Sequence, residues 1–471
     1  MTNNDDFWNI VEEKFVFDFS DNQKEVLSSF IDFFFNKNLE SLFLLKGYAG
    51  TGKTKLASAI INALNEIHTK FVLLAPTGRA AKVFSAYSTF PAFTIHKQIY
   101  RQKNTADTID SFTLGYNKDV STLFFIDEAS MIGEYGGNLS FGSGNLLDDI
   151  IHYVYNGKNN RLVLIGDEAQ LPPVGTYLSF ALSKEYLETV YDLSVYEVEM
   201  SEVLRQTENS GILYNATTVR GMIGGNLNSL IFKLDSFPDI FKIGGSELLE
   251  LLEDSYSHYG LEETMVLCRT NIRANKFNEG IRRTILYRED DFSSGDRVMI
   301  VKNNYFCAKD YDDMDFIANG EIATIKRIGR RSDYYDFHFI KADILLDGNN
   351  QEITSQILMD TLTSDSPALT HEENKKLFYN IQKDYPEIKS RRKLVEKIKE
   401  NEYFNALQMK FAYAVTCHKA QGGQWDAVFV DQGWLTETMM DDSFWRWLYT
   451  AVTRARKKLY LLNFNKVFFE Q

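Results

Sequence analysis

The chain has few cysteines, few prolines and no long hydrophobic run. Its three cysteines, Cys268, Cys307 and Cys417, lie far apart among 471 residues, without the spacing of a zinc site or a disulfide framework. Only 7 residues are proline and 44% are hydrophobic, which is the composition of a globular protein. No apolar stretch reaches the roughly 20 residues that a transmembrane helix requires. We therefore expect a soluble, intracellular protein of the cytoplasm, without a membrane segment.

An excess of positive charge is also missing, since the formal net charge is −14 at pH 7. This charge disfavours a protein that binds nucleic acid through a uniformly basic surface, although it leaves room for a locally basic channel. The length predicts two to four domains. Aromatic residues make up 14% of the chain, and we expect most of them in the core and some of them free to stack on bases.

Residues 47–54 read Gly-Tyr-Ala-Gly-Thr-Gly-Lys-Thr, between an apolar strand pattern at 41–46 and a helical pattern at 55–64. In such a strand–turn–helix unit, backbone N–H groups cradle phosphate oxygens. The Lys53 ammonium reaches the β- and γ-phosphates, and the Thr54 hydroxyl suits Mg²⁺. We therefore expect ATP and Mg²⁺ as cofactors. The expected nucleotide contacts are Gly47, Ala49, Gly50, Thr51, Gly52, Lys53 and Thr54.

Apolar strand patterns alternate with helical patterns in the first half of the chain, which predicts a doubly wound α/β fold. The strands after the glycine-rich turn are expected at 70–75, 122–126 and 161–165. Ligands of such a sheet bind at the carboxyl ends of its strands. Asp127 and Glu128 follow one strand, where Asp127 suits Mg²⁺ and Glu128 suits activation of water. Gln170 follows the next strand and is placed to sense the γ-phosphate.

The second half repeats the α/β pattern but is interrupted. Short strands of period two, which indicate a small barrel, occupy residues 296–301, 322–325, 335–339 and 342–346. A charged helical stretch follows at 366–405, and a strand at 411–415 returns to the α/β pattern. The predicted domains are 1–195 with a hairpin insert at 98–120, then 196–291 with 411–471, and an inserted domain at 292–410. A glycine- and serine-rich loop at 133–145 has no assigned function.

Two arginines outside the first unit, Arg205 and Arg454, are candidates to act across a cleft. An arginine in that position stabilises charge on a transferring phosphoryl group, which is worth about 10³–10⁵ in rate. The basic residues 456–458 are more simply explained as a solvated end. Side chains that donate to phosphates without reading bases recur in both units. They are Thr77, Lys82, Thr94, His96, Thr416, His418 and Lys419.

Taken together, these segments resemble the superfamily-one helicases over most of the chain. Motifs I, Ia, Ib, II, III, IV, V and VI correspond to residues 47–54, 75–82, 94–96, 126–131, 166–174, 202–206, 416–423 and 449–456. Gln23 fits the glutamine that reads adenine. The segments A-P-T-G-R-A-A-K, T-I-H-K and T-C-H-K-A-Q-G are closest to the RecD-like and Dda-like branch, which is known as 5′-to-3′ DNA helicases.

The resemblance implies two RecA-like doubly wound parallel-sheet motor domains. It places a strand-separating pin at the hairpin insert, with Phe112 or Tyr116 as the wedge, and a small β-barrel plus charged helices in the second motor. It implies contacts with single-stranded DNA at Pro76, Thr77, Lys82, Thr94, His96, Thr416, His418 and Lys419. It also implies catalytic roles for Lys53, Asp127, Glu128, Gln170, Arg205 and Arg454, and nucleotide contacts at Gln23 and Gly422.

The expected function is ATP-dependent translocation on single-stranded DNA, 5′-to-3′, with separation of a tailed duplex by a monomer that works beside replication or recombination proteins. Two alternatives remain open from the sequence. One is a translocase or recombination-complex subunit that does not unwind DNA alone. The other is a phosphate-loop ATPase that acts on protein partners, which the acidic net charge favours.

Overall fold

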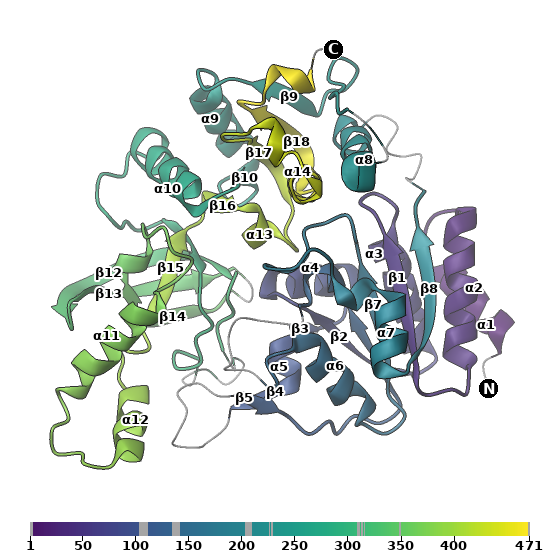
Figure 1. Cartoon of the computed structure of the whole chain (residues 1–471), viewed down its shortest axis with the longest axis horizontal. Helices are drawn as coiled ribbons and strands as arrows, with labels where there is room; N and C mark the ends of the chain where they lie inside the picture. Colours follow the sequence, from purple (N-terminus) through teal and green to yellow (C-terminus); the bar gives the residue numbers. More distant parts are fainter. Residues whose placement is uncertain are drawn as a thin grey trace.

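The computed structural model describes residues 3–102, 112–133, 142–202, 210–225, 227, 229–308, 311, 314, 316–347 and 350–469. It contains two parallel sheets, a closed five-stranded barrel and a two-stranded ribbon. In Figure 1 the first sheet lies to the lower right, the second at the top, and the barrel with its helices to the left of both. Among the described helices, none is long and apolar enough to cross a membrane.

The first sheet has six parallel strands in the order β3-β2-β6-β7-β1-β8. Their bounds are Ala92–Thr94, Lys70–Ala75, Thr122–Ile126, Arg161–Gly166, Ser41–Gly47 and Ser194–Met200. The helices of this half are α1 (Asn4–Lys14), α2 (Asp21–Phe35), α3 (Lys53–Glu66), α4 (Gly78–Ser88), α5 (Ile95–Ile99), α6 (Leu146–Tyr155) and α7 (Lys184–Tyr191). Alternate strand residues pack on the two faces, one beneath α1, α2 and α3 and the other beneath α6 and α7, as the doubly wound pattern predicts.

The predicted boundary between the two motor units at residue 195 is wrong. Strand β8 pairs in parallel with β1 over its whole length, from Ser194 beside Ser41 to Met200 beside Gly47. Several of its side chains are exposed or half-buried, because β8 is an edge strand with only one neighbouring strand. The first motor therefore extends to Met200.

The second sheet is also parallel, in the order β16-β10-β17-β18-β9. Its strands span Ala414–Thr416, Thr264–Cys268, Trp425–Asp431, Ala455–Leu462 and Ile240–Ile243. The helices around it are α8 (Gly211–Met222), α9 (Leu248–Tyr259), α10 (Asn271–Gly280), which continues as a π-turn at Ile281–Ile285, α13 (Cys417–Ala420) and α14 (Asp442–Val452). Short 3₁₀ turns lie at Ala129–Met131, Phe180–Leu182, Ile223–Gly225, Met359–Thr361, Glu437–Met439 and Lys466–Phe468.

The predicted small barrel is present and closed, with strands β11 (Arg297–Ile300), β12 (Ile322–Tyr334), β13 (Phe337–Leu346), β14 (Glu352–Leu358) and β15 (Leu407–Phe411). The expected strands at 335–339 and 342–346 are one strand, because Tyr335 and Asp336 adopt positive φ and form the turn before it. The expected strand at 411–415 is two: β15 closes the barrel, and β16 begins at Ala414 in the second sheet. Helices α11 (His371–Gln382) and α12 (Arg391–Lys399) fall within the predicted charged stretch.

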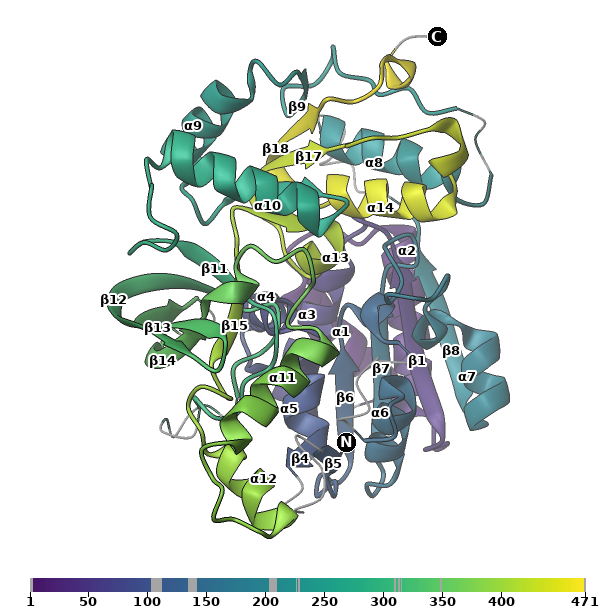
Figure 2. The same cartoon turned by 60° about the vertical axis from the view of Figure 1, so that its left-hand side comes forward.

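The hairpin insert is a ribbon of β4 (Tyr100–Gln102) and β5 (Phe112–Leu114). Figures 1 and 2 both place this ribbon at the far end of the first motor from the second sheet. The Phe112 and Tyr305 rings lie 4.3 Å apart, which joins the ribbon to the inserted domain. Residues 134–141 of the glycine- and serine-rich loop lie outside the described residues.

Asp296 forms a buried polar cluster that joins the barrel to the second sheet. The carboxylate is fully buried and accepts hydrogen bonds from Arg282 at 3.0 Å, from Arg288 at 2.6 Å and from the Tyr413 hydroxyl at 3.0 Å. Tyr413 lies between β15 and β16, and Arg282 lies in the π-turn after α10. One carboxylate therefore holds three separate elements together.

Candidate functional site

The glycine-rich turn between β1 and α3 has the backbone of a phosphate loop. Gly50 and Gly52 adopt φ of +79° and +90°, which side chains rarely tolerate. A Cβ on Gly47 would lie 2.9 Å from the Met200 carbonyl oxygen of β8, so any larger residue at this position would clash with β8. Gly52 is the N-cap of α3 and supplies no side-chain cap. The first amides of α3 are therefore left for an anion, as the sequence predicts.

Lys53 lies within this loop. Its Nζ donates to the carbonyl oxygens of Gly47 at 2.5 Å and Tyr48 at 2.8 Å. Burial lowers the pKa of Lys53, and the carboxylates of Asp167, Glu128 and Asp127 oppose that shift. Three carboxylates that follow strand ends, those of Asp167, Glu128 and Asp127, therefore interact electrostatically with the Lys53 ammonium.

Asp127 and Glu128 follow β6, as predicted. The Glu128 N–H donates to Asp127 Oδ1 at 2.8 Å, and Glu128 itself adopts φ +54°. Burial, with Glu128 as neighbour, raises the pKa of Asp127 to about 7. Among the described residues, no group of three or more His, Cys, Asp or Glu is placed to hold a metal. A hydroxyl at Thr54 and a carboxylate at Asp127 fit Mg²⁺, which is commonly held by one or two protein ligands with phosphates and water.

Four buried glutamines carry a side-chain atom without a partner in the described part of the chain, and two of them, Gln23 and Gln170, are predicted site residues. Gln23 completes a capping box with Ser20, where Gln23 Oε1 accepts the Ser20 N–H at 3.0 Å, and its Nε2 is buried and unbonded. Gln170 is 7% exposed, and its Oε1 is buried and unbonded. Buried polar atoms are normally satisfied. Both side chains therefore fit contacts with a ligand, which for Gln23 is the role the sequence suggested.

Tyr449 of α14 bridges the two motors. Its hydroxyl donates to Asp167 Oδ2 at 2.8 Å and accepts the Ala49 N–H of the phosphate loop at 2.8 Å. The other Asp167 oxygen, Oδ1, accepts the Ala169 N–H at 3.0 Å. Burial raises the pKa of Tyr449, so the hydroxyl stays protonated. Tyr449 is the first residue of the segment 449–456, which the sequence identified as a motif. The role of its hydroxyl becomes visible only in the contact between the two motors.

The segment after β7 is held by the second motor as well. The Leu171 N–H donates to Thr450 Oγ1 at 2.8 Å, and Gln421 Nε2 donates to the Leu171 carbonyl oxygen at 2.6 Å. Arg220 of α8 lies over the Tyr48 ring, 3.9 Å from its centroid. Sequence reasoning missed Arg220, Gln421 and Thr450 as partners of the first motor, because their partners are distant in sequence.

Arg454 is 3% exposed and lies near the phosphate loop, since its charge lowers the pKa of Lys53. Its guanidinium donates to the carbonyl oxygens of Thr450 at 3.1 Å and Gly423 at 3.2 Å. Within the described ranges, Arg454 has no carboxylate partner within 4.0 Å. A buried guanidinium bonded only to neutral oxygens suits a phosphate. Arg205 lies outside the described residues.

Gly422 lies against the first motor. With φ +72°, a Cβ at this residue would be 2.8 Å from Ala80 Cβ and 3.3 Å from Thr77 Oγ1. The structure therefore gives Gly422 a packing contact with the start of α4, and its contact with a nucleotide stays a prediction. Beside it, Arg79 donates to the Gln424 carbonyl oxygen at 3.1 Å and stacks over Trp425 at 4.0 Å.

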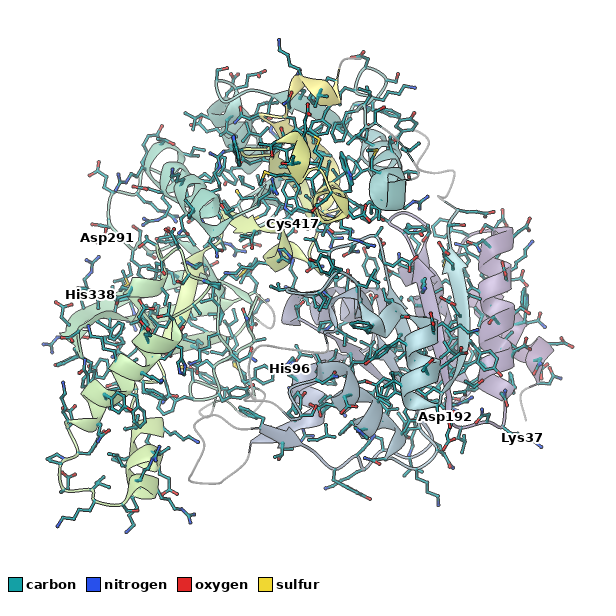
Figure 3. The ribbon with its side chains drawn as sticks, in the orientation of Figure 1. Lys37, His96, Asp192, Asp291, His338 and Cys417 are labelled. Carbon is teal, nitrogen blue, oxygen red and sulfur yellow. The ribbon has the colours of Figure 1, made fainter. Side chains whose placement is uncertain are left out.

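The residues expected to contact DNA lie at the carboxyl ends of β2, β3 and β16. Thr77 and Thr94 cap α4 and α5, where their hydroxyls accept the N–H groups of Ala80 and Lys97, both at 3.2 Å. Pro76 links β2 to α4, and Thr416 precedes α13. In Figure 3 His96 lies in the first motor and Cys417, the first residue of α13, lies in the second.

The basic members of this set are not equivalent. Burial lowers the pKa of His96 to about 4, so its imidazole is neutral near pH 7. Burial also lowers the pKa of His418. Burial and the charge of Lys410 lower the pKa of Lys419 to about 8. Lys82 donates to the Asp347 carbonyl oxygen of the barrel. The first motor therefore touches the inserted domain through a residue expected to contact DNA.

Of the two proposed wedge residues, Phe112 does not suit the role. Its side chain is 6% exposed and packs on Tyr305, at the ribbon position that pairs with Gln102, whereas a wedge must be open to the DNA. Tyr116 is 83% exposed just after β5 and remains a candidate. The tip of the hairpin, residues 103–111, lies outside the described residues.

Two family profiles match the sequence in the two motors. Residues 20–223 match the AAA domain, and residues 411–462 match the UvrD-like helicase C-terminal domain. The first match contains the phosphate loop and the carboxylates after β6, and the second contains α13 and α14. Tyr449, in the second matched region, contacts the phosphate loop, which lies in the first matched region.

Several curated proteins are similar over much of the chain. An uncharacterized protein of Acanthamoeba polyphaga mimivirus is 22% identical over 90% of this chain and 96% of its own length. The ATP-dependent RecD2 DNA helicase of Deinococcus radiodurans is 23% identical over 89% of this chain and 46% of its own length. The ATP-dependent DNA helicase dda of Enterobacteria phage T4 is 28% identical over 54% of this chain and 55% of its own length. The chain thus spans about half of each of these two helicases.

Among solved structures, a Pif1 helicase from Bacteroides in complex with ADP-AlF3 and ssDNA aligns with a TM-score of 0.49. That alignment has 16% identity and covers 97% of this chain and 95% of the other.

Proposed function

We propose that the chain is a superfamily-one helicase of the RecD-like and Dda-like branch, an ATP-dependent DNA helicase that moves 5′-to-3′ along single-stranded DNA. The observation that carries the proposal is the Tyr449 bridge, because it joins the phosphate loop of one motor to the second motor. A nucleotide bound at residues 47–54 therefore acts at the boundary between two bodies, as a motor requires.

In this proposal ATP binds the loop through its amides and Lys53, with Gln23 at the adenine. Mg²⁺, held by Thr54 and Asp127, would neutralise phosphate charge. Glu128 orients the attacking water, and Gln170 senses the γ-phosphate. Arg454 stabilises the charge on the transferring group from the second motor, and Arg205, which lies outside the described residues, is proposed for the same role. Loss of the γ-phosphate then changes how tightly the motors close.

Closure moves one set of phosphate contacts relative to the other along a DNA strand. Pro76, Thr77, Thr94 and His96 form the set on the first motor. Thr416, His418 and Lys419 form the set on the second. Such contacts are blind to base sequence and sensitive to salt, with a slope of roughly 0.7 log units per neutralised phosphate on a single strand. Tyr116 is the proposed separating residue of the pin.

The decisive experiment compares unwinding of duplexes with a 5′ or a 3′ single-stranded tail, with DNA or RNA as the tailed strand. We expect release of the 5′-tailed DNA duplex only, together with ATP hydrolysis strongly stimulated by single-stranded DNA. Movement along DNA without strand release would instead indicate a translocase. Hydrolysis indifferent to nucleic acid would indicate an ATPase that acts on proteins.

Replacing Tyr449 with phenylalanine should slow DNA-stimulated ATP hydrolysis about tenfold to a hundredfold. The variant keeps the ring but loses the hydroxyl that holds Asp167 and the Ala49 amide, so the phosphate loop is less well positioned. We expect most of the change in kcat, with KM for ATP within about threefold of the wild type. Steady-state hydrolysis with saturating oligothymidylate measures both constants.

Tyr155→Phe is the matched control, because the Tyr155 hydroxyl also makes an interior hydrogen bond, to the Ser41 carbonyl oxygen at 2.9 Å, away from the loop. Equal losses of kcat in the two variants would assign the effect to general stability. An unchanged kcat in Tyr449→Phe would remove the hydroxyl from the mechanism.

A further inference from the structure

A buried cluster at the start of α6 holds both strands of the hairpin ribbon. The hydroxyl of Tyr100, the first residue of β4, donates to Asp149 Oδ2 of α6 at 2.6 Å. The Ser143 N–H, near the end of the glycine- and serine-rich loop, donates to the two oxygens of the same carboxylate at 3.2 and 3.1 Å. From the same loop, the Gly142 N–H donates to the Phe112 carbonyl oxygen of β5 at 2.8 Å. One carboxylate and the end of one loop therefore hold β4 and β5 together.

The bond between Tyr100 and Asp149 is of the strong kind. Asp149 is 4% exposed, and within the described residues its donors are a phenol and a backbone amide. An O–H donor to an ionised carboxylate lies at about 2.5–2.7 Å and bonds roughly twice as strongly as a neutral pair. Burial raises the pKa of Tyr100, and the bond to Asp149 raises it further, so the hydroxyl stays protonated and donates.

The backbone of the loop is packed directly onto this pair. Gly142 adopts φ +47°, and a Cβ at this residue would lie 2.0 Å from Asp149 Oδ2 and 2.7 Å from Tyr100 Cε1. No side chain fits between the loop and the carboxylate. The sequence assigned no function to the glycine- and serine-rich loop, whereas its described end supports the ribbon.

Asp149 is itself fixed to the core of the first motor. Helix α6 begins at the cap Asn145, whose side chain accepts the Asp148 N–H at 3.1 Å. Its apolar side chains pack in the same buried cluster as residues of β1, β6 and β7, and these side chains are Leu147, Ile150, Ile151, Tyr153 and Val154. The carboxylate is therefore held by the same rigid body that carries the nucleotide site.

The supported end of the ribbon is the end at which DNA is expected. Helix α5 leads directly into β4, and the Tyr100 ring lies 5.5 Å from the ring of His96, a proposed phosphate contact. The Gly115 N–H donates to the Ile99 carbonyl oxygen at 2.7 Å, and Tyr116, the proposed separating residue, comes next in the chain. A residue that acts by its position requires neighbours that fix that position.

We infer that Asp149 is a positioning residue for strand separation, because its carboxylate fixes the ribbon to the first motor and so holds Tyr116 at the fork. The inference rests on the proposed function and adds to it a residue outside the helicase motifs. ATP hydrolysis and movement along DNA use the contact between the motors, whereas the opening of base pairs also requires a ribbon that does not yield.

The test is Asp149→Asn, which keeps the size of the side chain, removes its charge and replaces one acceptor oxygen with an NH₂ donor. We expect the single-turnover rate of unwinding of a 5′-tailed duplex to fall about tenfold. We expect kcat for ATP with saturating oligothymidylate, and the rate of movement along single-stranded DNA, to stay within about twofold of the wild type. The loss should be larger for a GC-rich duplex, because a loosened ribbon must wait for base pairs to open by themselves.

Tyr100→Phe is the second variant, since it removes the hydroxyl and keeps the ring beside His96. It should reproduce the loss of unwinding, and it decides the question alone if Asp149→Asn does not fold. In the double variant the loss should be no greater than the larger single loss, because both substitutions break the same bond. Asp148→Asn is the control, because Asp148 is the half-exposed neighbour on α6 and faces His152 at 3.6 Å. It should unwind DNA at the wild-type rate.

Two outcomes would overturn the inference. Unwinding at the wild-type rate by both variants would mean that other contacts, such as Phe112 on Tyr305, hold the ribbon. Equal losses of hydrolysis, movement and unwinding, with a lower melting temperature, would mean that Asp149 serves only the fold. Failure of the proposed function is seen in a different protein: wild type that moves along DNA without releasing a strand would refute the proposed function, and the inference with it.

Discussion

Lys53→Ala should abolish ATP hydrolysis, with kcat reduced about 10³-fold or more, while single-stranded DNA still binds. The ammonium lies inside the loop, bonded to the carbonyl oxygens of Gly47 and Tyr48, and three carboxylates converge on its charge. Without it, no cation of the loop meets the β- and γ-phosphates, and developing negative charge in the transition state is left unbalanced. Steady-state hydrolysis and fluorescence anisotropy of a labelled oligonucleotide measure the two properties separately.

Lys55→Ala is the control for this experiment, because Lys55 is exposed two residues further along α3. It should hydrolyse ATP at the wild-type rate. Turnover by Lys53→Ala at a rate near that of the wild type would refute the nucleotide site, and loss of DNA binding in the same variant would show that the substitution disturbs the fold.

Asp296→Ala should lower the free energy of unfolding of the second motor by about 3–5 kcal/mol. The fully buried carboxylate bonds Arg282, Arg288 and the Tyr413 hydroxyl, so its removal leaves two guanidinium groups buried without their anion. Urea unfolding followed by tryptophan fluorescence is the measurement. Four of the five tryptophans, Trp425, Trp434, Trp445 and Trp447, lie in the second motor, so the signal reports mainly that part.

Asp291→Ala provides the comparison, since Asp291 is exposed in the same connection and is labelled in Figure 3. We expect a change within about 0.5 kcal/mol for this variant. If the two substitutions cost the same, the cluster around Asp296 does not hold the barrel and the second sheet together.

The sequence predicted the elements whose patterns are local. An apolar run ended by a glycine-rich turn or by acidic residues identified β1, β6 and β7, and the motif at 47–54 located the loop that its glycines shape. The period of two predicted a barrel insert, which the closed barrel of β11 to β15 confirms. These features depend on residues within a few positions of one another.

What the sequence did not predict depends on distant partners. Strand β8 belongs to the first sheet only because β1 lies beside it, and its own half-polar pattern carries no sign of that neighbour. Tyr449 meets Ala49 across 400 positions of sequence. Phe112 looked like an exposed wedge because its partner, Tyr305, lies in another domain. Each of these three features depends on how two parts of the chain that are distant in sequence pack against each other.

The short connection from β15 to β16 couples any movement of the second motor to the barrel. Only Ala412 and Tyr413 separate the last barrel strand from the strand that leads into α13, and two residues span at most about 7 Å. The barrel interior and one face of the second sheet form a single hydrophobic core. Barrel and second motor thus share one core across a two-residue connection, so a rotation of the second motor at the nucleotide site would carry the barrel with it.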